Sequence, residues 1–210
     1  MVAEVAAMSE ELNPTPDMPG LSPPVLEALG RVPRHRFVPD IEREFAYQNR
    51  PLPIGYGQTI SQPYIVAFMT ELLKLKPGSR VLEIGTGCGY QTAMLAEMGA
   101  EVYSIEIVEP LASQAAQTLQ SLGYDHVHVR LGDGYHGWVE HAPYDGILVA
   151  AGASHVPQPL LDQLKLGGRM AIPLGESHAA QVLLLIKKDV EGAVHRQEVL
   201  QVRFVPLTRH

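Results

Sequence analysis

The sequence predicts an α/β fold built on one mostly parallel, seven-stranded sheet with helices on both faces. Five apolar strand segments alternate with helical segments between residues 80 and 173, and such alternation produces parallel strands with right-handed crossovers. Glycines stand where the helical segments end, at Gly99, Gly123 and Gly167. Two final apolar segments have only a short polar link between them, which indicates a C-terminal antiparallel hairpin.

Residues 1–20 are expected to form a mobile arm, and residues 21–210 a single domain. The arm carries Pro14, Pro16 and Pro19 among acidic and polar residues. Such a composition at a chain end favours disorder over packing.

The segment before the first predicted strand combines short helices with a loop. Residues 25–29 read as a helix that Gly30 ends, and residues 41–48 as a second helical stretch. The proline- and glycine-containing residues 49–61 read as a loop. A helix then starts at Pro63, where apolar residues recur at helical spacing, and Ser61 is a favoured residue type for its N-cap.

The predicted core elements follow in regular order. The expected strands are residues 80–84, 101–107, 127–131, 146–150, 169–173, 181–187 and 194–205, and the expected helices are residues 90–98, 110–122 and 157–164.

Composition limits the class of function. The 210 residues suit one soluble domain, and the net charge of −7 argues against a nucleic-acid partner. The basic cluster at residues 31–36 reads as a solvated loop. Cys88 is the only cysteine, which fits a reducing compartment. Without a signal peptide or an apolar run of 18 residues, a cytoplasmic, monomeric enzyme away from membranes is expected.

A glycine-rich loop is the strongest functional signal. Gly85, Gly87 and Gly89 follow a buried strand and precede a helix. This arrangement lets a ligand approach the backbone closely and places amide donors beside it. The G-x-G-x-G spacing differs from the G-x-G-x-x-G of dinucleotide sites and favours S-adenosylmethionine over NAD.

Two acidic residues support a nucleoside cofactor. Glu106 ends the second predicted strand, 19 residues after Gly87, where a carboxylate can accept hydrogen bonds from ribose hydroxyls. Asp133 ends the third strand and can accept a hydrogen bond from an adenine amino group. Asp145, at the start of the fourth strand, reads as strand-edge polarity.

A second polar cluster, Gln58-Thr-Ile-Ser-Gln-Pro63, lies at a helix N-terminus and can bind a carboxylate. Ser61 is either a cap or a hydroxyl donor to that carboxylate. No nucleophile elbow or H-E-x-x-H motif is present. His126 and His128 read as a polar strand face rather than metal ligands, and Cys88 as a small residue of the cofactor loop, so no metal is expected.

Together these residues resemble the protein-L-isoaspartate(D-aspartate) O-methyltransferase family, from about residue 31 to the C-terminus. The Gln-Thr-Ile-Ser-x-Pro segment is the specific signal, because the glycine-rich loop is common to class I methyltransferases. The matching segments are residues 32–39 (VPRHRFVP), 57–63 (GQTISQP), 81–91 (VLEIGTGCGYQ), 132–134 (GDG), 164–169 (LKLGGR) and 203–207 (RFVPL).

The resemblance implies a class I, Rossmann-like methyltransferase. It would methylate the free carboxyl of L-isoaspartyl and D-aspartyl residues in damaged proteins with S-adenosyl-L-methionine, which initiates repair through a succinimide. Ser61 matches the family's active-site serine. The residues expected to contact the cofactor are Gln58, Thr59, Ile60, Ser61, Gly85, Thr86, Gly87, Cys88, Glu106, Asp133 and Gly134.

Three alternatives stay open at this point. A class I methyltransferase of small molecules shares the loop, Glu106 and Asp133 but leaves residues 58–63 unexplained. An NAD-dependent oxidoreductase requires its third glycine where Tyr90 stands. A catalytically silent binding module can share the fold.

Overall fold

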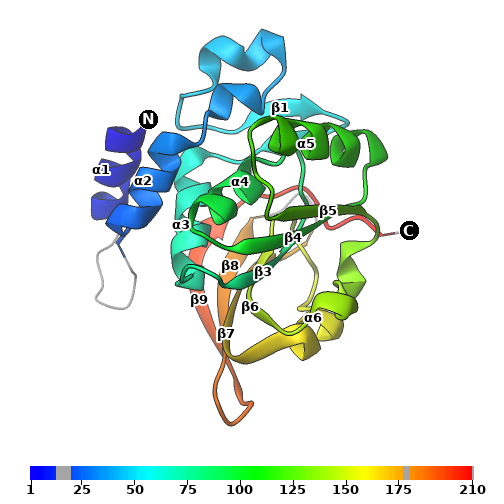
Figure 1. Ribbon diagram of the computed structural model, residues 1–210. Helices are drawn as coiled ribbons and strands as arrows, with labels where there is room; N and C mark the ends of the chain where they lie inside the picture. The colour runs from blue at the N-terminus through cyan, green and yellow to red at the C-terminus, as the bar shows by residue number, and fades with distance from the viewer. Residues whose placement is uncertain (13–19, 177–179, 210) are drawn as a thin grey trace.

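A computed structural model describes residues 1–12, 20–176 and 180–209 of the chain. Its centre is a seven-stranded sheet in the order β5-β4-β3-β6-β7-β8-β9, flanked by helices on both faces (Figure 1). The α/β class, the seven strands and the closing hairpin expected from the sequence are confirmed.

The first five strands of this sheet are parallel. The chain runs outward from β3 through β4 to β5, then returns to the other side of β3 at β6. A crevice forms at such a reversal, beyond the carboxyl ends of the strands. The strands are β3 (Arg80–Ile84), β4 (Glu101–Glu106), β5 (Val127–Leu131), β6 (Tyr144–Val149) and β7 (Leu164–Leu174).

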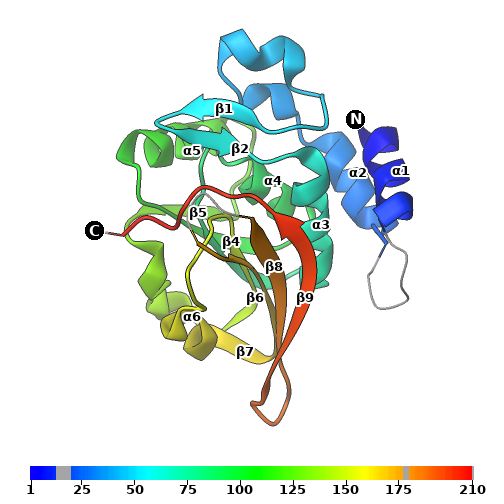
Figure 2. The ribbon, with the colours of Figure 1, turned by 180° about the vertical axis from the view of Figure 1, so that it is seen from behind.

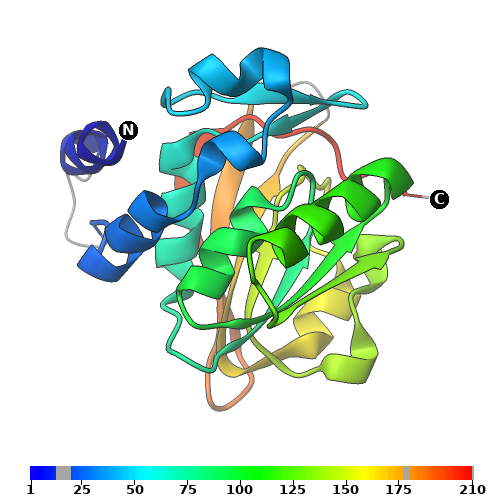
Figure 3. The same cartoon turned by 45° about the horizontal axis from the view of Figure 1, so that its top comes forward.

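Two hydrophobic cores cover the two faces of the sheet. On one face lie α3 (Pro63–Leu73), α4 (Tyr90–Glu97) and α5 (Glu109–Ser121), the layer in front of the sheet in Figure 3. On the other face α6 (Gln158–Gln163) buries Leu160 and Leu161. Alternation along β3 divides the faces, since Val81 belongs to the first core and Leu82 to the second.

The C-terminal hairpin consists of β8 (Gln181–Lys188) and β9 (Val194–Val202). β8 pairs antiparallel with both β7 and β9. After β9 the chain crosses back below the hairpin of the N-terminal half, as Figure 2 shows from behind. The last residues thereby reach the carboxyl ends of β3 and β6, where Gly152 donates a hydrogen bond to the Val205 carbonyl over 2.8 Å.

The predicted N-terminal arm is wrong over residues 2–12. This segment forms α1 (Val2–Leu12), and Val5 is fully buried. Met1, Val2, Met8 and Leu12 also pack against the first core, because their spacing gives the helix one apolar side. Residues 13–19 of the same expected arm lie outside the described residues. The division of the chain at residue 21 stays a prediction.

The remaining N-terminal elements also differ from expectation. α2 (Pro23–Arg31) continues through Gly30, and residues 40–45 form the 3₁₀ helix η2 (Asp40–Phe45). The predicted loop of residues 49–61 contains a hairpin of β1 (Leu52–Gly55) and β2 (Gln58–Ile60). Its turn has positive φ at three successive residues, Gly55, Tyr56 and Gly57. Because the middle residue is an exposed tyrosine rather than a glycine, the sequence did not indicate this turn.

Glu71 ties α2 to α3 and should make stability depend on pH. Its buried carboxylate accepts hydrogen bonds from the Ser22 amide (2.8 Å) and hydroxyl (2.6 Å) and from Lys74. Burial alone would raise the pKa of Glu71, but these hydrogen bonds outweigh it and hold the pKa below its usual value. The contribution is therefore complete above the unfolded-state pKa and is lost as pH falls through the folded-state pKa.

We expect Glu71→Gln to lower the free energy of unfolding by about 2 kcal/mol at pH 7. The difference in unfolding free energy between wild type and variant should shrink below about pH 4, where the carboxyl of the unfolded chain becomes protonated before that of the folded protein. Urea unfolding at several pH values measures both effects. The exposed Glu27 of α2 offers the control Glu27→Gln. An equal loss at pH 7 and pH 3 would contradict the electrostatic origin.

Among the described residues, no helix has the length and apolar character needed to cross a membrane.

Candidate functional site

The glycine-rich loop runs from the end of β3 to the start of α4. Gly85, Gly87 and Gly89 have φ values of +91°, +55° and +91°, so the loop turns sharply at each of them. At Gly89 a Cβ atom would also lie 3.1 Å from Leu119 Cδ1. Only glycine meets both demands, and the loop therefore presents bare backbone at the carboxyl end of the sheet.

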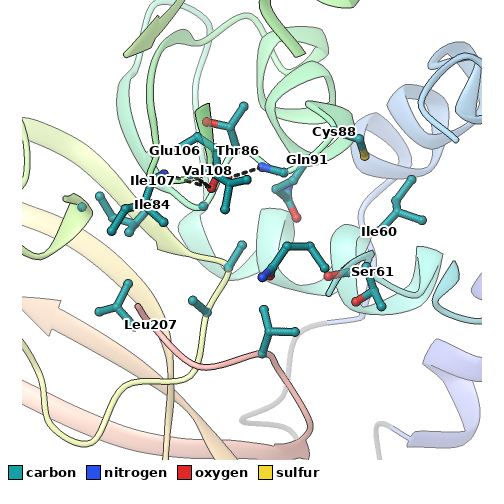
Figure 4. Close-up of a pocket in the computed structure, with 18 of the residues that line it drawn as sticks. Ile60, Ser61, Ile84, Thr86, Cys88, Gln91, Glu106, Ile107, Val108 and Leu207 are labelled. Carbon is teal, nitrogen blue, oxygen red and sulfur yellow. Dashed lines mark hydrogen bonds between the residues drawn. The ribbon is translucent and has the colours of Figure 1, made fainter. Parts of the chain in front are cut away.

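Glu106 holds this loop from the neighbouring strand. Its Oε2 accepts a hydrogen bond from the Gly87 amide (2.7 Å), and its Oε1 accepts from the Ile107 and Val108 amides (2.9 Å each), as Figure 4 shows. A carboxylate has about four acceptor positions, so these three bonds leave Oε2 able to accept one more. The carboxylate is thus fixed in place with capacity for one ligand hydroxyl.

The buried carboxylate of Glu83 stabilises the glycine-rich loop through a chain of hydroxyl groups. Glu83 Oε2 accepts from the hydroxyls of Thr92 and Ser104 (2.6 Å each), and Ser104 Oγ lies 2.5 Å from Thr86 Oγ1. Burial raises the pKa of Glu83 to about 7, despite the two hydroxyl donors. This chain of contacts fixes Thr86 within the loop, and no local pattern in the sequence indicates this role for Glu83.

The strap of residues 58–61 approaches the loop from the N-terminal half. Gln58, Thr59 and Ile60 form β2, and Ser61 leads toward α3. Pro63 is the first residue of α3, which makes Gln62 the N-cap, so the N-cap expected at Ser61 is wrong. The Ser61 hydroxyl makes no hydrogen bond within the part of the chain that the structure describes, and it is free to meet a ligand.

These elements enclose a cleft of roughly 790 Å³, counting space open to solvent. Glu106 lies on one side, Ile60 and Ser61 on another, and Leu207 closes a third (Figure 4). Ten of the predicted residues line it: Gln58, Thr59, Ile60, Ser61, Gly85, Thr86, Gly87, Cys88, Glu106 and Gly134. We call it the donor cleft.

Asp133 is the predicted residue that does not line the donor cleft. Its Oδ1 accepts a hydrogen bond from the Tyr135 amide (2.9 Å), which caps the 3₁₀ helix η3 (Gly134–His136). Its Oδ2 lies 3.5 Å from Arg209 Nε. The contact of Asp133 with adenine stays a prediction.

Sequence reasoning missed other residues of the donor cleft. Tyr90 and Gln91 come from the start of α4, and Ile107 and Val108 follow Glu106. The C-terminal residues 205–208 form a further wall. The pairing of Gly152 with Val205 and Leu207 helps to hold this wall in place, and it is a long-range contact that leaves no local pattern in the sequence.

A second cleft of roughly 1010 Å³, also counting open space, adjoins the first. We call it the acceptor cleft. Thr59, Ser61, Ala150 and Val205 line both clefts, so the two spaces meet at the strap. The acceptor cleft is further lined by Pro51, Gln62, Ile65, Ala180, Gln201, Val202, Arg203 and Phe204.

The donor cleft fits the S-adenosylmethionine expected from the sequence. The glycine-rich loop leaves room for close approach, and Glu106 offers the acceptor that a ribose hydroxyl needs. Within the described residues no group of histidine, cysteine and carboxylate side chains could hold a metal ion, and His126 and His128 are not brought into one.

Cys88 should be unreactive although it lines the cleft. Its surroundings raise the pKa of the thiol to about 11, so far less of it is thiolate at pH 8 than for an ordinary cysteine. Iodoacetamide should alkylate the folded protein more than about 100-fold more slowly than the same protein unfolded in urea. Mass spectrometry of a time course measures both rates. Equal rates would show an accessible thiolate.

The chain is similar to known proteins over nearly its whole length. A family model described as protein-L-isoaspartate(D-aspartate) O-methyltransferase matches residues 18–210. A protein-L-isoaspartate O-methyltransferase 2 of Polaromonas sp. (strain JS666 / ATCC BAA-500) is 57% identical over 208 residues and 99% of each chain. A protein-L-isoaspartate O-methyltransferase of Opitutus terrae is 61% identical over 184 residues, 88% of this chain and 78% of that one.

Two solved structures extend the similarity. One described as a protein-L-isoaspartate O-methyltransferase has a TM-score of 0.85 at 29% identity, over 98% of this chain and 65% of that chain. One described as a beta-aspartate methyltransferase from Plasmodium falciparum in complex with S-adenosyl-L-homocysteine has a TM-score of 0.77 at 26% identity, over 99% and 98%. The chain therefore belongs to the protein-L-isoaspartate(D-aspartate) O-methyltransferase family.

Proposed function

We propose that this protein transfers the methyl group of S-adenosyl-L-methionine to the free carboxyl of L-isoaspartyl residues, and of D-aspartyl residues, in damaged proteins and peptides. The observation that carries the proposal is the meeting of two clefts at Ser61. One cleft has the glycine-rich loop and Glu106 that suit the cofactor, and the other is open and suits a chain segment. Family membership points to the same reaction.

The residues present are sufficient for this chemistry. When bound, the cofactor supplies an electrophilic methyl group on a positively charged sulfur. The acceptor carboxylate is already ionised at neutral pH, so the site needs no general base. The task of the protein is to hold the two groups in line and away from water, and the free hydroxyl of Ser61 can donate a hydrogen bond that orients the carboxylate.

The acceptor cleft suits an extended peptide. Gln181 fixes the backbone beside it, since the Phe204 amide donates to Gln181 Oε1 (2.8 Å) and Gln181 Nε2 donates to the Phe204 carbonyl (3.1 Å). The residues on both sides, Arg203 and Val205, line the cleft. A substrate backbone pairing along residues 202–206 would bring its isoaspartyl side chain to Ser61. Methyl-ester formation would then allow the adjacent amide nitrogen to attack the ester carbonyl, which releases methanol and gives a succinimide.

We further propose that the protein works as a monomer in the cytoplasm, without nucleic-acid or membrane partners. The net charge of −7 argues against a nucleic-acid partner, and the single cysteine fits a reducing compartment such as the cytoplasm.

Two peptides that differ in one L-isoaspartyl or L-aspartyl residue test the function. With methyl-labelled S-adenosyl-L-methionine, we expect base-labile label on the isoaspartyl peptide alone. Calorimetric binding of S-adenosyl-L-homocysteine, measured in parallel, separates two failures. Cofactor binding without labelling would point to a methyltransferase of another substrate, and absence of binding would remove the methyltransferase assignment.

A further inference from the structure

Arg34 is a buried cation, although its sequence neighbourhood reads as a solvated basic loop. The residue begins the 3₁₀ helix η1 (Arg34–Arg36) and is 0% exposed. The solvated-loop expectation is therefore wrong at this position. Arg36, two residues later in the same motif, is exposed, so the arginines of the motif have different tasks.

The guanidinium of Arg34 binds main-chain carbonyls rather than a carboxylate. Nε donates to the Ala46 carbonyl (2.8 Å), and Nη2 donates to the carbonyls of Ser61 (2.9 Å) and Arg50 (3.4 Å). None of the ion pairs among the described residues includes Arg34. Burial of a charge without a counter-charge is costly, which makes a purely space-filling role a poor explanation for an arginine here.

The same guanidinium also contacts the glycine-rich side of the site. Arg34 Cζ lies 4.6 Å from the centre of the Tyr90 ring, within the range of a cation–π contact. Tyr90 is the first residue of α4, directly after Gly89, and it lines the donor cleft. One side chain thus joins Ser61, where the two clefts meet, to the helix that follows the cofactor loop.

We propose that Arg34 is a positioning residue that sets the strap of residues 58–61 against the glycine-rich loop, so that methyl donor and acceptor carboxylate lie in line. This inference rests on the proposed function. The planar guanidinium donates from Nε and Nη2 in fixed directions toward Ala46 and Ser61, and a lysine ammonium cannot reproduce that geometry. Glu106 and the loop glycines keep their own contacts, whereas the strap also lines the donor cleft, so we expect the loss of Arg34 to raise the cofactor Kd by far less than it lowers kcat.

The test compares Arg34→Lys, Arg34→Met and the matched control Arg36→Met with wild type. Thermal unfolding establishes folding, calorimetry gives the Kd of S-adenosyl-L-homocysteine, and methylation of an isoaspartyl peptide gives kcat and KM. We expect kcat to fall about 30- to 100-fold in both Arg34 variants, because a misplacement of about 1 Å can cost about 100-fold. Kd should stay within about threefold, and Arg36→Met should match wild type.

The other outcomes each overturn the inference. If both Arg34 variants fold and keep the wild-type kcat, Arg34 serves core packing only. If neither variant folds, Arg34 is likewise assigned to packing of the core. A rise in Kd that accounts for the lost activity would assign it to cofactor binding. Recovery of kcat in Arg34→Lys would show that the positive charge at this position is sufficient and that the fixed geometry of the guanidinium is not required. An inactive wild type would remove the proposed function together with this inference, whereas active wild type and active Arg34 variants remove the inference only.

Discussion

Replacement of Glu106 by glutamine should weaken the binding of S-adenosyl-L-homocysteine by about 30-fold. The carboxylate accepts three backbone amides and has one acceptor position left for a ribose hydroxyl. A glutamine side chain would remove the charge, and its NH₂ group would face one of the backbone amides that donate to the carboxylate. The loss of a hydrogen bond to a charged group is about 2 kcal/mol, which corresponds to the expected change in Kd.

Isothermal titration calorimetry measures this change directly. The control is Glu109→Gln, three residues further on at the exposed start of α5, which should leave Kd within about twofold. A Glu106→Gln protein that is folded and binds like wild type would mean that the ligand makes no contact with this carboxylate.

Ser61→Ala should lower kcat/KM for an isoaspartyl peptide by between about tenfold and a hundredfold. The expected loss combines one hydrogen bond to a charged acceptor with the misalignment that follows. The fold should survive, because the Ser61 hydroxyl bonds to none of the described residues and the strap is held through the Ser61 carbonyl by Arg34. Steady-state kinetics with the peptide, together with the unfolding temperature, measures both.

The pH dependence identifies the kind of role that Ser61 has. If Ser61 orients a carboxylate, Ser61→Ala should reduce kcat/KM by the same factor from pH 6 to pH 9. Ser61→Thr keeps the hydroxyl and should retain more activity than Ser61→Ala. A loss that appears only above a particular pH would instead indicate that Ser61 takes part in proton transfer.

Patterns local in sequence predicted the central sheet and much of the donor cleft. Strand periodicity placed β3 to β6 within a few residues, and the glycine spacing located the loop at Gly85–Gly89 because positive φ restricts those positions to glycine. The acid at Glu106 followed from its distance along the chain. Each of these features depends on residues close together in sequence, which a single chain displays directly.

Features that depend on tertiary contacts escaped prediction. In the sequence, Arg34 cannot be distinguished from an exposed charged residue of a loop. Its buried position depends on hydrogen bonds to the carbonyls of Ala46 and Ser61, which lie further along the chain. The cleft wall at residues 205–208 exists because Gly152 pairs with Val205 and Leu207, and no periodicity announces a contact made across more than 50 positions of the chain.

The shared boundary of the two clefts has a consequence for turnover. Apart from Thr59, Ser61, Ala150 and Val205, the clefts are lined by different residues, so neither ligand has to pass through the space of the other. Such an arrangement implies a ternary complex and a single displacement, in which the methyl group never rests on the enzyme. Release of the methylated protein from the acceptor cleft is then separate from release of S-adenosyl-L-homocysteine from the donor cleft. Slow release from one cleft does not block release from the other.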